Sequence, residues 1–485
     1  MEYVIKGYEP ADALRYFEEI SAIPRGSKNE QAVAQYVYDF AKDLGLEARI
    51  DTTYWNVVVK KPASPGCEDK PAVMIQGHLD MVCEKNAGTA HDFEKDPLDL
   101  YIEDGLLKAR GTTLGADNGQ AVAYMMALLA RNDLVHPPLE CVFTSMEEIG
   151  LLGALQVDTS DLHSKYMLNV DCGPEGTVFV SCAGGLLQEI SKKVRWEKAG
   201  GDTVSLQVRG LLGGHSAAMI DHEMGNSIKV MGRILHGIQK QMEVHIVSLS
   251  GGSKMNAIPR ESDAVITVPA GQGDKAIEIA SHIAATAKAE LAASDGGLYL
   301  QCEKAGAAER QMSLADSRQI IEFIFLVKNG VYTMSMEMPG LVVCSSNLGV
   351  ATTDDTGVHL TDFIRSSDPT IRDHLDDEIR SLAQLLDIEI APADPMPGWK
   401  YEAESPLRQL FMKLYKEQTG KEMVAVATHG GLECGILKDK MPDLDIIAFG
   451  PTADGAHTPD ESLDLASFER TWNLILATLK ALAEQ

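Results

Sequence analysis

Two adjacent carboxylates, Glu147 and Glu148, stand between the apolar stretches "PLECVF" and "IGLLGA". Solvated surface acids are the ordinary interpretation of such a pair. The apolar residues on both sides instead favour at least one carboxylate that points into a cleft. A carboxylate removed from water needs a cation or a metal ion as its partner, so the pair raises the question of a metal site.

Two histidines and three more acids follow a similar pattern. His78 and Asp80 occupy alternate positions where the apolar run "AVMIQGHLD" ends, so they share one face of a strand. Asp117 follows the glycine-rich turn "GTTLGAD", Asp171 ends the run "YMLNVD", and His457 lies in the loop "FGPTADGAHTPDE". These positions lie at or just beyond the ends of expected strands or turns.

Each residue taken alone has a structural explanation. An acid at the start of a helix, such as Asp117, is a common N-cap, and an HxD pair is often structural. The turn before Asp117 is no phosphate loop, because it lacks the sequence GK[ST]. Taken together, two histidines and three or four carboxylates suit a hydrolytic dinuclear site for a metal such as Zn²⁺, with one carboxylate bridging.

The surrounding sequence predicts the elements that would position these side chains. Apolar strands are expected at 56–62, 72–80, 139–145 and 166–171, with helices at 118–132 and 149–156 between them. Nearly continuous apolar strands that alternate with helices indicate an α/β fold, a mostly parallel sheet with helices on both faces. Ligands bind at strand ends in such sheets.

The middle of the chain has a different character. Strands such as "QEISKKVRW" and "DTVSLQVRG" alternate polar and apolar residues, which predicts an α+β domain whose sheet is covered on one face. After the turn-rich "APADPMPGW" the first pattern returns. We therefore expect a catalytic metal-binding domain formed by 1–184 and 396–485, with an inserted lid domain at 185–395.

Composition narrows the class of partner and the compartment. The chain has 485 residues and a net charge of −28, which argues against nucleic acid or an anionic membrane as partner. No apolar run approaches the ~18–20 residues of a membrane span, and we expect no secretory signal. Eight scattered cysteines without a CxxC motif suggest reduced thiols and a cytoplasmic location.

Eight motifs carry a resemblance to a known family. They are "QGHLDMV", "ARGTTLGADNG", "TSMEEIGLLGA", "LNVDCGPEG", "LLGGHSA", "NAIPRE", "HGGLECGIL" and "GPTADGAHTPDE". In order and spacing the chain resembles, essentially from end to end, the co-catalytic zinc exopeptidases of the aminoacylase/carboxypeptidase-G type. The resemblance implies two Zn²⁺ ions per chain, with Mn²⁺ or Co²⁺ as possible substitutes.

The resemblance also implies roles for individual residues. His78 and Asp171 would hold one metal ion, Glu148 and His457 the other, and Asp117 would bridge both. Glu147 would be the general base, and Asp80 would orient His78. The resemblance assigns His215 to the oxygen of the reaction intermediate. From their residue types and positions, Asn256 is expected to bind the substrate backbone, Arg365 the terminal carboxylate and Glu433 a free α-amino group.

Residue patterns alone favour a surface loop histidine for His215 and a surface ion-pair residue for Arg365, so these two roles stay open. The implied activity is hydrolysis of dipeptides with a free N-terminus, Xaa-His and carnosine-like ones included, with broad specificity. A carboxypeptidase, a tripeptidase, an N-acyl amino-acid deacylase or a non-catalytic binding protein are the alternatives, and the presence of Glu147 speaks against the last. The inserted region is near twice the lid of many relatives, so it stays open whether His215 acts within its own chain or across a homodimer.

Overall fold

The computed structural model describes residues 3–485 and divides into two compact units. The first unit contains the residues up to Ser181 together with Tyr401–Ala427 and Leu432–Gln485. The second unit contains Cys182–Lys400 and the tetrapeptide Thr428–Gly431. Backbone hydrogen bonds tie the ends of the second unit together: Cys182 pairs with Trp399, and Ala183 N–H donates to Gly430 O.

The first unit is built on an eight-stranded sheet with the order β1-β2-β6-β3-β7-β23-β8-β22. Its central strands β6, β3, β7 and β23 run parallel, whereas β1, β2 and β8 pair antiparallel with their neighbours. Every residue of β3, β6 and β7 is buried. The expected α/β fold with a mostly parallel central sheet is confirmed. The strands are β1 (Glu47–Ile50), β2 (Val57–Lys61), β3 (Val73–His78), β6 (Leu139–Thr144), β7 (Tyr166–Asn169), β8 (Thr177–Cys182), β22 (Val424–Thr428) and β23 (Asp445–Ala448).

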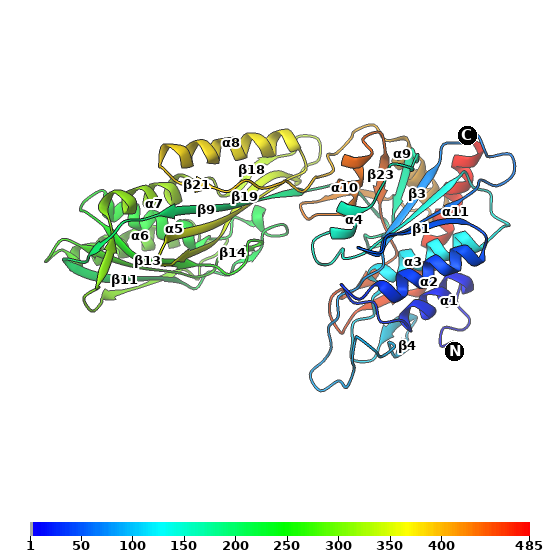
Figure 1. The fold of residues 1–485 in the computed structure, drawn as a ribbon, viewed down its shortest axis with the longest axis horizontal. Helices are drawn as coiled ribbons and strands as arrows, with labels where there is room; N and C mark the ends of the chain where they lie inside the picture. The colour runs from blue at the N-terminus through cyan, green and yellow to red at the C-terminus, as the bar shows by residue number, and fades with distance from the viewer. Residues whose placement is uncertain (1–2) are drawn as a thin grey trace. The chain divides into compact units, whose positions relative to one another are not determined.

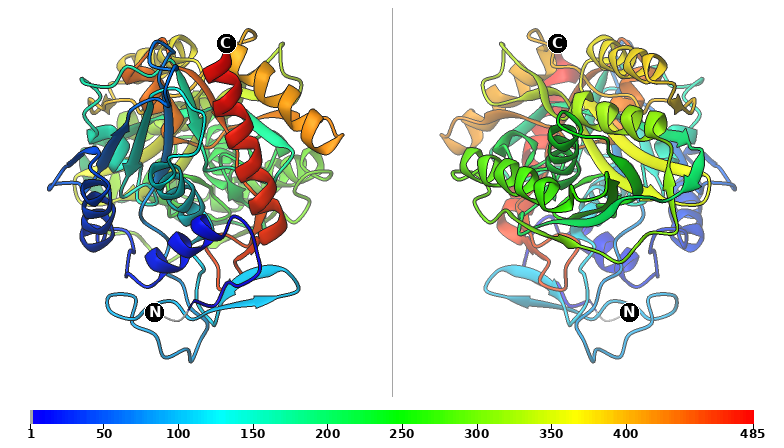
Figure 2. Two further views of the ribbon diagram at one scale, coloured as in Figure 1. Left: turned by 90° about the vertical axis from the view of Figure 1, so that its right-hand side faces the viewer. Right: turned by 90° about the vertical axis from the view of Figure 1, so that its left-hand side faces the viewer.

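Seven helices accompany this sheet within the described residues of the first unit. Helix α3 is almost entirely buried, and its Tyr124 stacks on Phe468 of α11 and donates a hydrogen bond to the Phe468 carbonyl at 2.7 Å. Figure 2 shows α9 and α11 side by side. The N-terminal and C-terminal parts of the chain therefore share one core. The helices are α1 (Ala11–Ser21), α2 (Gln31–Asp43), α3 (Ala116–Ala130), α4 (Leu152–Gln156), α9 (Pro406–Thr419), α10 (Glu433–Lys440) and α11 (Leu465–Glu484).

A small antiparallel sheet joins two distant loops of the first unit. Its order is β24-β25-β5-β4, formed by β4 (Leu100–Glu103), β5 (Leu106–Ala109), β24 (Ala453–Asp454) and β25 (Ser462–Asp464). The pair β4–β5 precedes Asp117 in the chain, and β24 and β25 enclose the loop of His457. This sheet therefore brings the segments that carry these two residues to the same place.

The second unit is an antiparallel sheet covered by helices (Figure 1). The strand order is β16-β11-β15-β13-β19-β20-β9-β21, with β18 paired to β19. Its four α-helices and its strands contribute to one buried apolar cluster, which explains the alternating burial along β9 and β11. The strands are β9 (Gly184–Lys193), β11 (Asp202–Arg209), β13 (His245–Gly251), β15 (Ser262–Val268), β16 (Tyr299–Lys304), β18 (Gly330–Met334), β19 (Val342–Thr353), β20 (Gly357–Ser366) and β21 (Glu389–Ile390), and the helices are α5 (Ser227–Gln239), α6 (Gly273–Glu290), α7 (Leu314–Leu326) and α8 (Pro369–Leu385).

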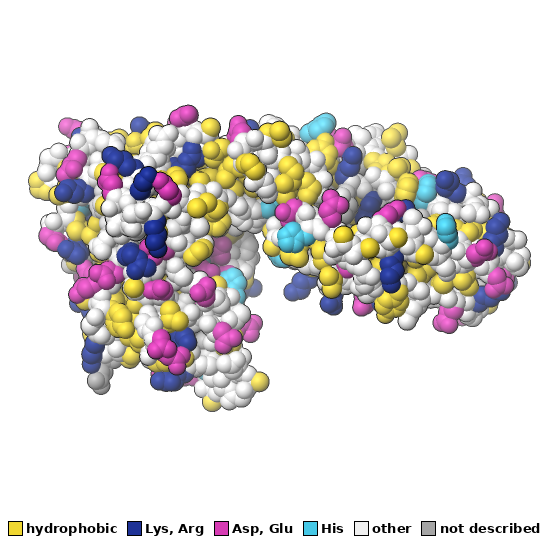
Figure 3. Space-filling model, turned by 180° about the vertical axis from the view of Figure 1, so that it is seen from behind, with side chains coloured by type: hydrophobic (Ala, Val, Ile, Leu, Met, Phe, Trp, Pro, Cys, Tyr) yellow, Lys and Arg dark blue, Asp and Glu magenta, His cyan; other side chains and the backbone are white. Residues whose placement is uncertain are grey.

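Short pairs complete the second unit. They are β10 (Trp196–Lys198) with β17 (Arg310–Met312), and β12 (Gly214–His215) with β14 (Ala257–Ile258), beside the 3-10 helix Ile220–His222. In the part of the chain that the structure describes, no helix is long and apolar enough to cross a membrane. None of the eight cysteines forms a disulfide bond within residues 3–485. Acidic and basic side chains are interspersed on the face drawn in Figure 3, which shows no large patch of one sign.

Candidate metal centre

Two imidazoles and three carboxylates meet at one edge of the sheet in the first unit. The Nε2 atom of His78 lies 3.0 Å from Asp117 Oδ1 and 3.4 Å from Asp171 Oδ1. The Nε2 atom of His457 lies 3.3 Å from Asp117 Oδ2 and 3.0 Å from Glu148 Oε1. The two oxygens of Asp117 therefore face different histidines, one accompanied by Asp171 and the other by Glu148.

Parallel strand pairing explains how three of these side chains come together. His78 is the last residue of β3, Asp171 follows β7 by two residues, and Glu148 follows β6 by four. Strand β3 lies between β6 and β7 and runs parallel to both, so the carboxyl ends of the three strands reach the same edge. This edge is where open α/β sheets place their ligands.

Two further loops supply Asp117 and His457. The chain turns into α3 at Gly115, whose φ of 67° is in the left-handed region, and a Cβ atom there would lie 2.6 Å from an Arg25 nitrogen. His457 lies between β24 and β25 and also has a positive φ, 65°. Glycine is the residue that adopts such a backbone conformation without strain, so the close turn before Asp117 depends on Gly115.

The donor set suits divalent metal ions. No lysine or arginine among residues 3–485 forms an ion pair with Asp117, Glu148 or Asp171, so negative charge is in excess at this edge. Burial raises the pKa of Asp171 to about 7, and contacts with the carboxylates of Asp117 and Glu148 raise the pKa of His457 to about 10. Imidazole nitrogens with carboxylate oxygens are ligands of Zn²⁺ and similar ions.

A buried carboxylate oxygen of Glu148 without a hydrogen-bond donor also supports a metal ion at this place. Glu148 Oε1 is buried and accepts no hydrogen bond, although it lies 3.0 Å from His457 Nε2. One ligand atom each of His78, Asp117 and Glu148 lies within 4.8 Å of the other two. A buried acceptor without a donor is costly, and a bound cation would satisfy it.

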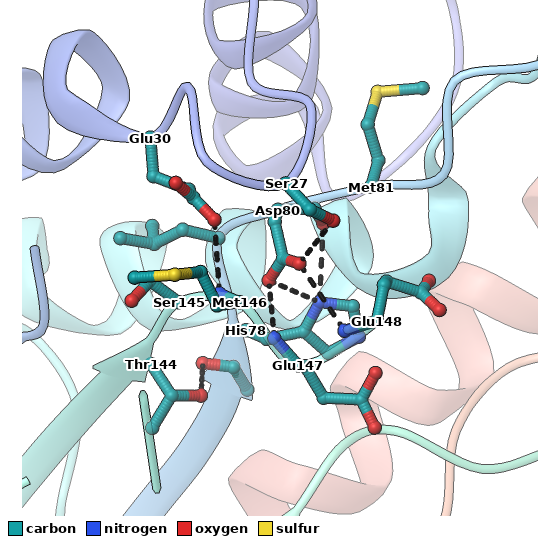
Figure 4. Close-up of polar contacts among 12 residues, drawn as sticks. Ser27, Glu30, His78, Asp80, Met81, Thr144, Ser145, Met146, Glu147 and Glu148 are labelled. Atoms are coloured by element: carbon teal, nitrogen blue, oxygen red, sulfur yellow. Dashed lines mark hydrogen bonds and ion pairs between the residues drawn. The ribbon is translucent and has the colours of Figure 1, made fainter. Parts of the chain in front are cut away.

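Asp80 organises the turn that carries Glu147 and Glu148 (Figure 4). Its carboxylate is buried and accepts hydrogen bonds from the Glu147 N–H at 3.1 Å, the Glu148 N–H at 3.3 Å and the Ser27 hydroxyl at 2.8 Å. Asp80 Oδ1 also lies 3.4 Å from His78 Nδ1. Burial alone would raise the pKa of Asp80, but its partners, His78 first, hold it below the usual value.

The two adjacent glutamates have different environments. Their side chains leave the turn in different directions (Figure 4), and the N–H of the preceding Met146 donates to Glu30 Oε1 at 3.0 Å. Glu148 reaches His457, whereas within residues 3–485 Glu147 forms no ion pair. Burial, joined by Asp171, Glu433 and Glu148, raises the pKa of Glu147 well above its usual value despite the proximity of His78.

Glu433 lies in a buried polar network below this edge. Its side chain has 0% exposure, and Oε2 accepts hydrogen bonds from Gln76 at 2.5 Å and Thr144 at 2.7 Å. Asn169 donates to the Gln76 side chain at 2.6 Å, so the network spans β3, β6 and β7. Burial raises the pKa of Glu433 to about 7. The sequence patterns identified Glu433 but none of its partners.

Glu461 and Arg25 support the site but were not predicted from the sequence. Glu461 accepts hydrogen bonds from the N–H groups of Leu114 at 2.8 Å, Gly115 at 2.9 Å and Asp117 at 3.2 Å. The fully buried Arg25 donates to the carbonyls of Leu79, Asp80 and Gly115. Both residues hold ligand-bearing loops through backbone groups, which leave no side-chain pattern; the only sequence signal is that Glu461 shares the "HTPDE" loop with His457.

In the second unit, the remaining predicted residues lie near one another. Asn256 Nδ2 is 3.5 Å from His215 Nε2, and both residues line a cavity of about 450 Å³. Arg365 is on β20, and its Nε donates to the hydroxyl of Ser216, the neighbour of His215, at 3.3 Å. Burial lowers the pKa of Arg365 to about 10. The structure therefore brings His215, Asn256 and Arg365 to one region of this unit.

Comparisons with known proteins agree with this picture. Residues 74–481 match the model of "Peptidase family M20/M25/M40". The chain is 35% identical over 469 residues to the cytosol non-specific dipeptidase of Escherichia coli (strain K12), with 96% of each chain covered. The aminoacylhistidine dipeptidase of Vibrio alginolyticus superposes with a TM-score of 0.91 at 36% identity, covering 99% of this chain and 98% of that one.

More distant structures share the fold. A tripeptidase from Staphylococcus aureus superposes with a TM-score of 0.55 at 16% identity, covering 99% of this chain and all of that one, which supports the fold alone. The predicted family resemblance and the predicted class of enzyme are confirmed. The match over most of the chain shows that it belongs to peptidase family M20/M25/M40 and is a metallopeptidase.

Proposed function

We propose that the protein is a dinuclear metal-dependent dipeptidase that hydrolyses dipeptides with a free N-terminus, Xaa-His and carnosine-like ones among them. The observation that carries the metal centre is the position of Asp117, whose two oxygens face His78 at 3.0 Å and His457 at 3.3 Å. The substrate class rests on two relatives named as dipeptidases, each of which this chain matches over nearly its full length.

The residues that would hold the two metal ions fall into two groups. His78 and Asp171 would bind one ion, Glu148 and His457 the other, and Asp117 would bind both. The arrangement of contacts around the two imidazoles supports this division. Two Zn²⁺ ions, with Mn²⁺ or Co²⁺ as substitutes, would polarise the peptide carbonyl and lower the pKa of a water molecule.

Glu147 would act as the general base. It would take a proton from the attacking water and deliver it to the leaving amine, which requires hydrogen-bond reach to both groups. The turn held by Asp80 supports this role, because it directs Glu147 away from Glu148, the proposed ligand. Asp80 would also fix the orientation of the His78 imidazole through Nδ1.

Residues of the second unit would recognise the substrate. His215 would donate to the oxygen on which charge develops, Asn256 would bind the substrate backbone, and Arg365 would bind the terminal carboxylate through its guanidinium. The proposed contact of Glu433 with the α-amino group has less support, because its side chain is fully buried and bonded to Gln76 and Thr144.

A metal-dependence assay with a substrate panel tests the proposal. Chelated protein should be inactive on β-Ala-His and other unblocked dipeptides, and added Zn²⁺ should restore activity with two ions bound per chain. Activity confined to N-acetylated amino acids, or to tripeptides, would instead favour the deacylase or tripeptidase alternative. A cytoplasmic location is part of the proposal and is supported by the name of the Escherichia coli relative.

A further inference from the structure

Arg365 is a buried cation without an acidic partner. The residue is 9% exposed, and within residues 3–485 no carboxylate forms an ion pair with it. Its neighbours are neutral: the Ser216 hydroxyl at 3.3 Å from Nε and the Phe363 ring, 4.7 Å from the guanidinium carbon. An unpaired buried charge is unfavourable, so this guanidinium is suited to an anionic ligand.

His429 is linked to this cation through Ser345. It belongs to the tetrapeptide that joins the second unit, is 7% exposed, and its Nε2 lies 2.7 Å from the Ser345 hydroxyl. Ser345 on β19 is the direct cross-strand partner of Arg365 on β20. Burial and then the charge of Arg365 lower the pKa of His429 to about 4, so the imidazole is neutral at physiological pH.

The chemistry of this position decides whether Arg365 stays free. An acidic side chain there would pair with the guanidinium, satisfy it internally and repel a second carboxylate. A small apolar side chain would leave the Ser345 hydroxyl without its partner. A neutral imidazole fills the space, bonds to Ser345 and leaves the positive charge uncompensated.

We propose that His429 is a specificity-determining residue, which keeps Arg365 unpaired and so makes the protein select peptides with a free terminal carboxylate. The inference rests on the proposed function, in which Arg365 binds that carboxylate. His429 acts through Ser345 and Arg365 and is a positioning residue, since it need not touch the substrate itself.

The test compares an unblocked dipeptide with the same dipeptide as its C-terminal amide, which lacks the charge. Wild-type protein should prefer the free acid by about tenfold or more in kcat/KM, the range expected for hydrogen bonds to a charged group. His429→Glu should raise KM for the free acid by about tenfold with little change in kcat, and leave the amide nearly unaffected. His429→Gln, which is neutral and can bond to Ser345, should keep the wild-type preference.

Controls separate this effect from loss of structure. His374→Glu places the same charge on an exposed histidine of the second unit and should leave the preference unchanged. If His429→Glu does not fold, His429→Gln still decides, because a preference as low as that of Arg365→Gln would overturn the inference. A folded His429→Glu with the wild-type preference would overturn it as well.

The two peptides also test the wild-type protein, and its results separate the proposed dipeptidase function from the proposed roles of Arg365 and His429. Cleavage of neither peptide would refute the proposed dipeptidase function. Equal cleavage of acid and amide would refute the carboxylate role of Arg365, and with it the role of His429, while leaving the dipeptidase function intact.

Discussion

Replacing Glu461 by Gln tests how the loop of Asp117 is held. Glu461 Oε2 accepts from the N–H groups of Leu114 and Gly115 at 2.8 and 2.9 Å, and Oε1 accepts from the Asp117 N–H at 3.2 Å. An amide keeps one oxygen. The orientation that preserves more hydrogen bonds leaves the oxygen with Leu114 and Gly115 and turns the NH₂ group toward the Asp117 N–H, so that two donors face each other.

The expected magnitude follows from that single lost acceptor. A buried N–H without a partner costs about 1–3 kcal/mol, so the free energy of unfolding of the metal-free protein should fall by about that amount. The two facing donors would repel each other at the backbone of Asp117, whose two carboxylate oxygens face His78 and His457. We therefore also expect the metal affinity to fall by about 10–100-fold, the range for residues that orient ligands.

Competition with a chromophoric chelator measures the metal affinity, and urea unfolding in excess chelator measures the stability. Glu469→Gln, on the exposed side of α11, is the matched control and should change neither quantity. The reasoning is refuted if Glu461→Gln binds both metal ions as tightly as the control. A loss of stability with unchanged metal affinity would show that Glu461 supports the fold without positioning Asp117.

Two further predictions concern single carboxylates. Glu147→Gln should keep two metal ions and lower kcat by about 10²–10⁴-fold, whereas Glu148→Gln should first weaken metal binding. Metal titration and steady-state kinetics of both variants check this prediction. The opposite pattern would mean that Glu148 is the base and Glu147 the ligand. Burial raises the pKa of Asp362, which accepts from Ser346 and lies near Lys229, to about 7, above the ~3.9 of an unfolded chain. The folded state then binds more protons than the unfolded state between these pH values, so stability should fall as pH rises from about 4 to 7, and Asp362→Asn should reduce this fall in the melting temperature; an unchanged pH profile would contradict the assignment.

The sequence predicted the fold, and it predicted candidate site residues where the local signal was strong. Apolar runs followed by His or acidic residues identified His78, Glu148 and Asp171, and the structure brings all three to the edge formed by β3, β6 and β7. The parallel pairing needed for this was also predictable, because strands buried on both faces lack alternation. The assignment of each ligand to one metal ion came from the family resemblance and stays a prediction.

Other features depend on contacts that no local pattern records. Glu461 binds backbone N–H groups 344 to 347 positions earlier in the chain, and Arg25 binds carbonyls. Any residue type can supply such backbone groups. The side chains of the partners therefore give no sign in the sequence that Glu461 or Arg25 binds them. His429 could not be identified from the sequence for the same reason. Its proposed role depends on Ser345, 84 positions away, and on Arg365, the cross-strand partner of that serine.

Adjacency in sequence leaves Glu147 and Glu148 equivalent, and the environment of their turn removes that equivalence. Both N–H groups donate to the Asp80 carboxylate, which holds the backbone of the turn, and the two side chains leave that turn in different directions (Figure 4). The same carboxylate lies 3.4 Å from His78 Nδ1, so the orientation of the imidazole and that of the turn are set by one group. A displacement of Asp80 would therefore move a proposed ligand, the proposed base and a second proposed ligand together. Asp80 would in this way affect the positions of three proposed site residues, Glu147, Glu148 and His78, through direct contacts alone.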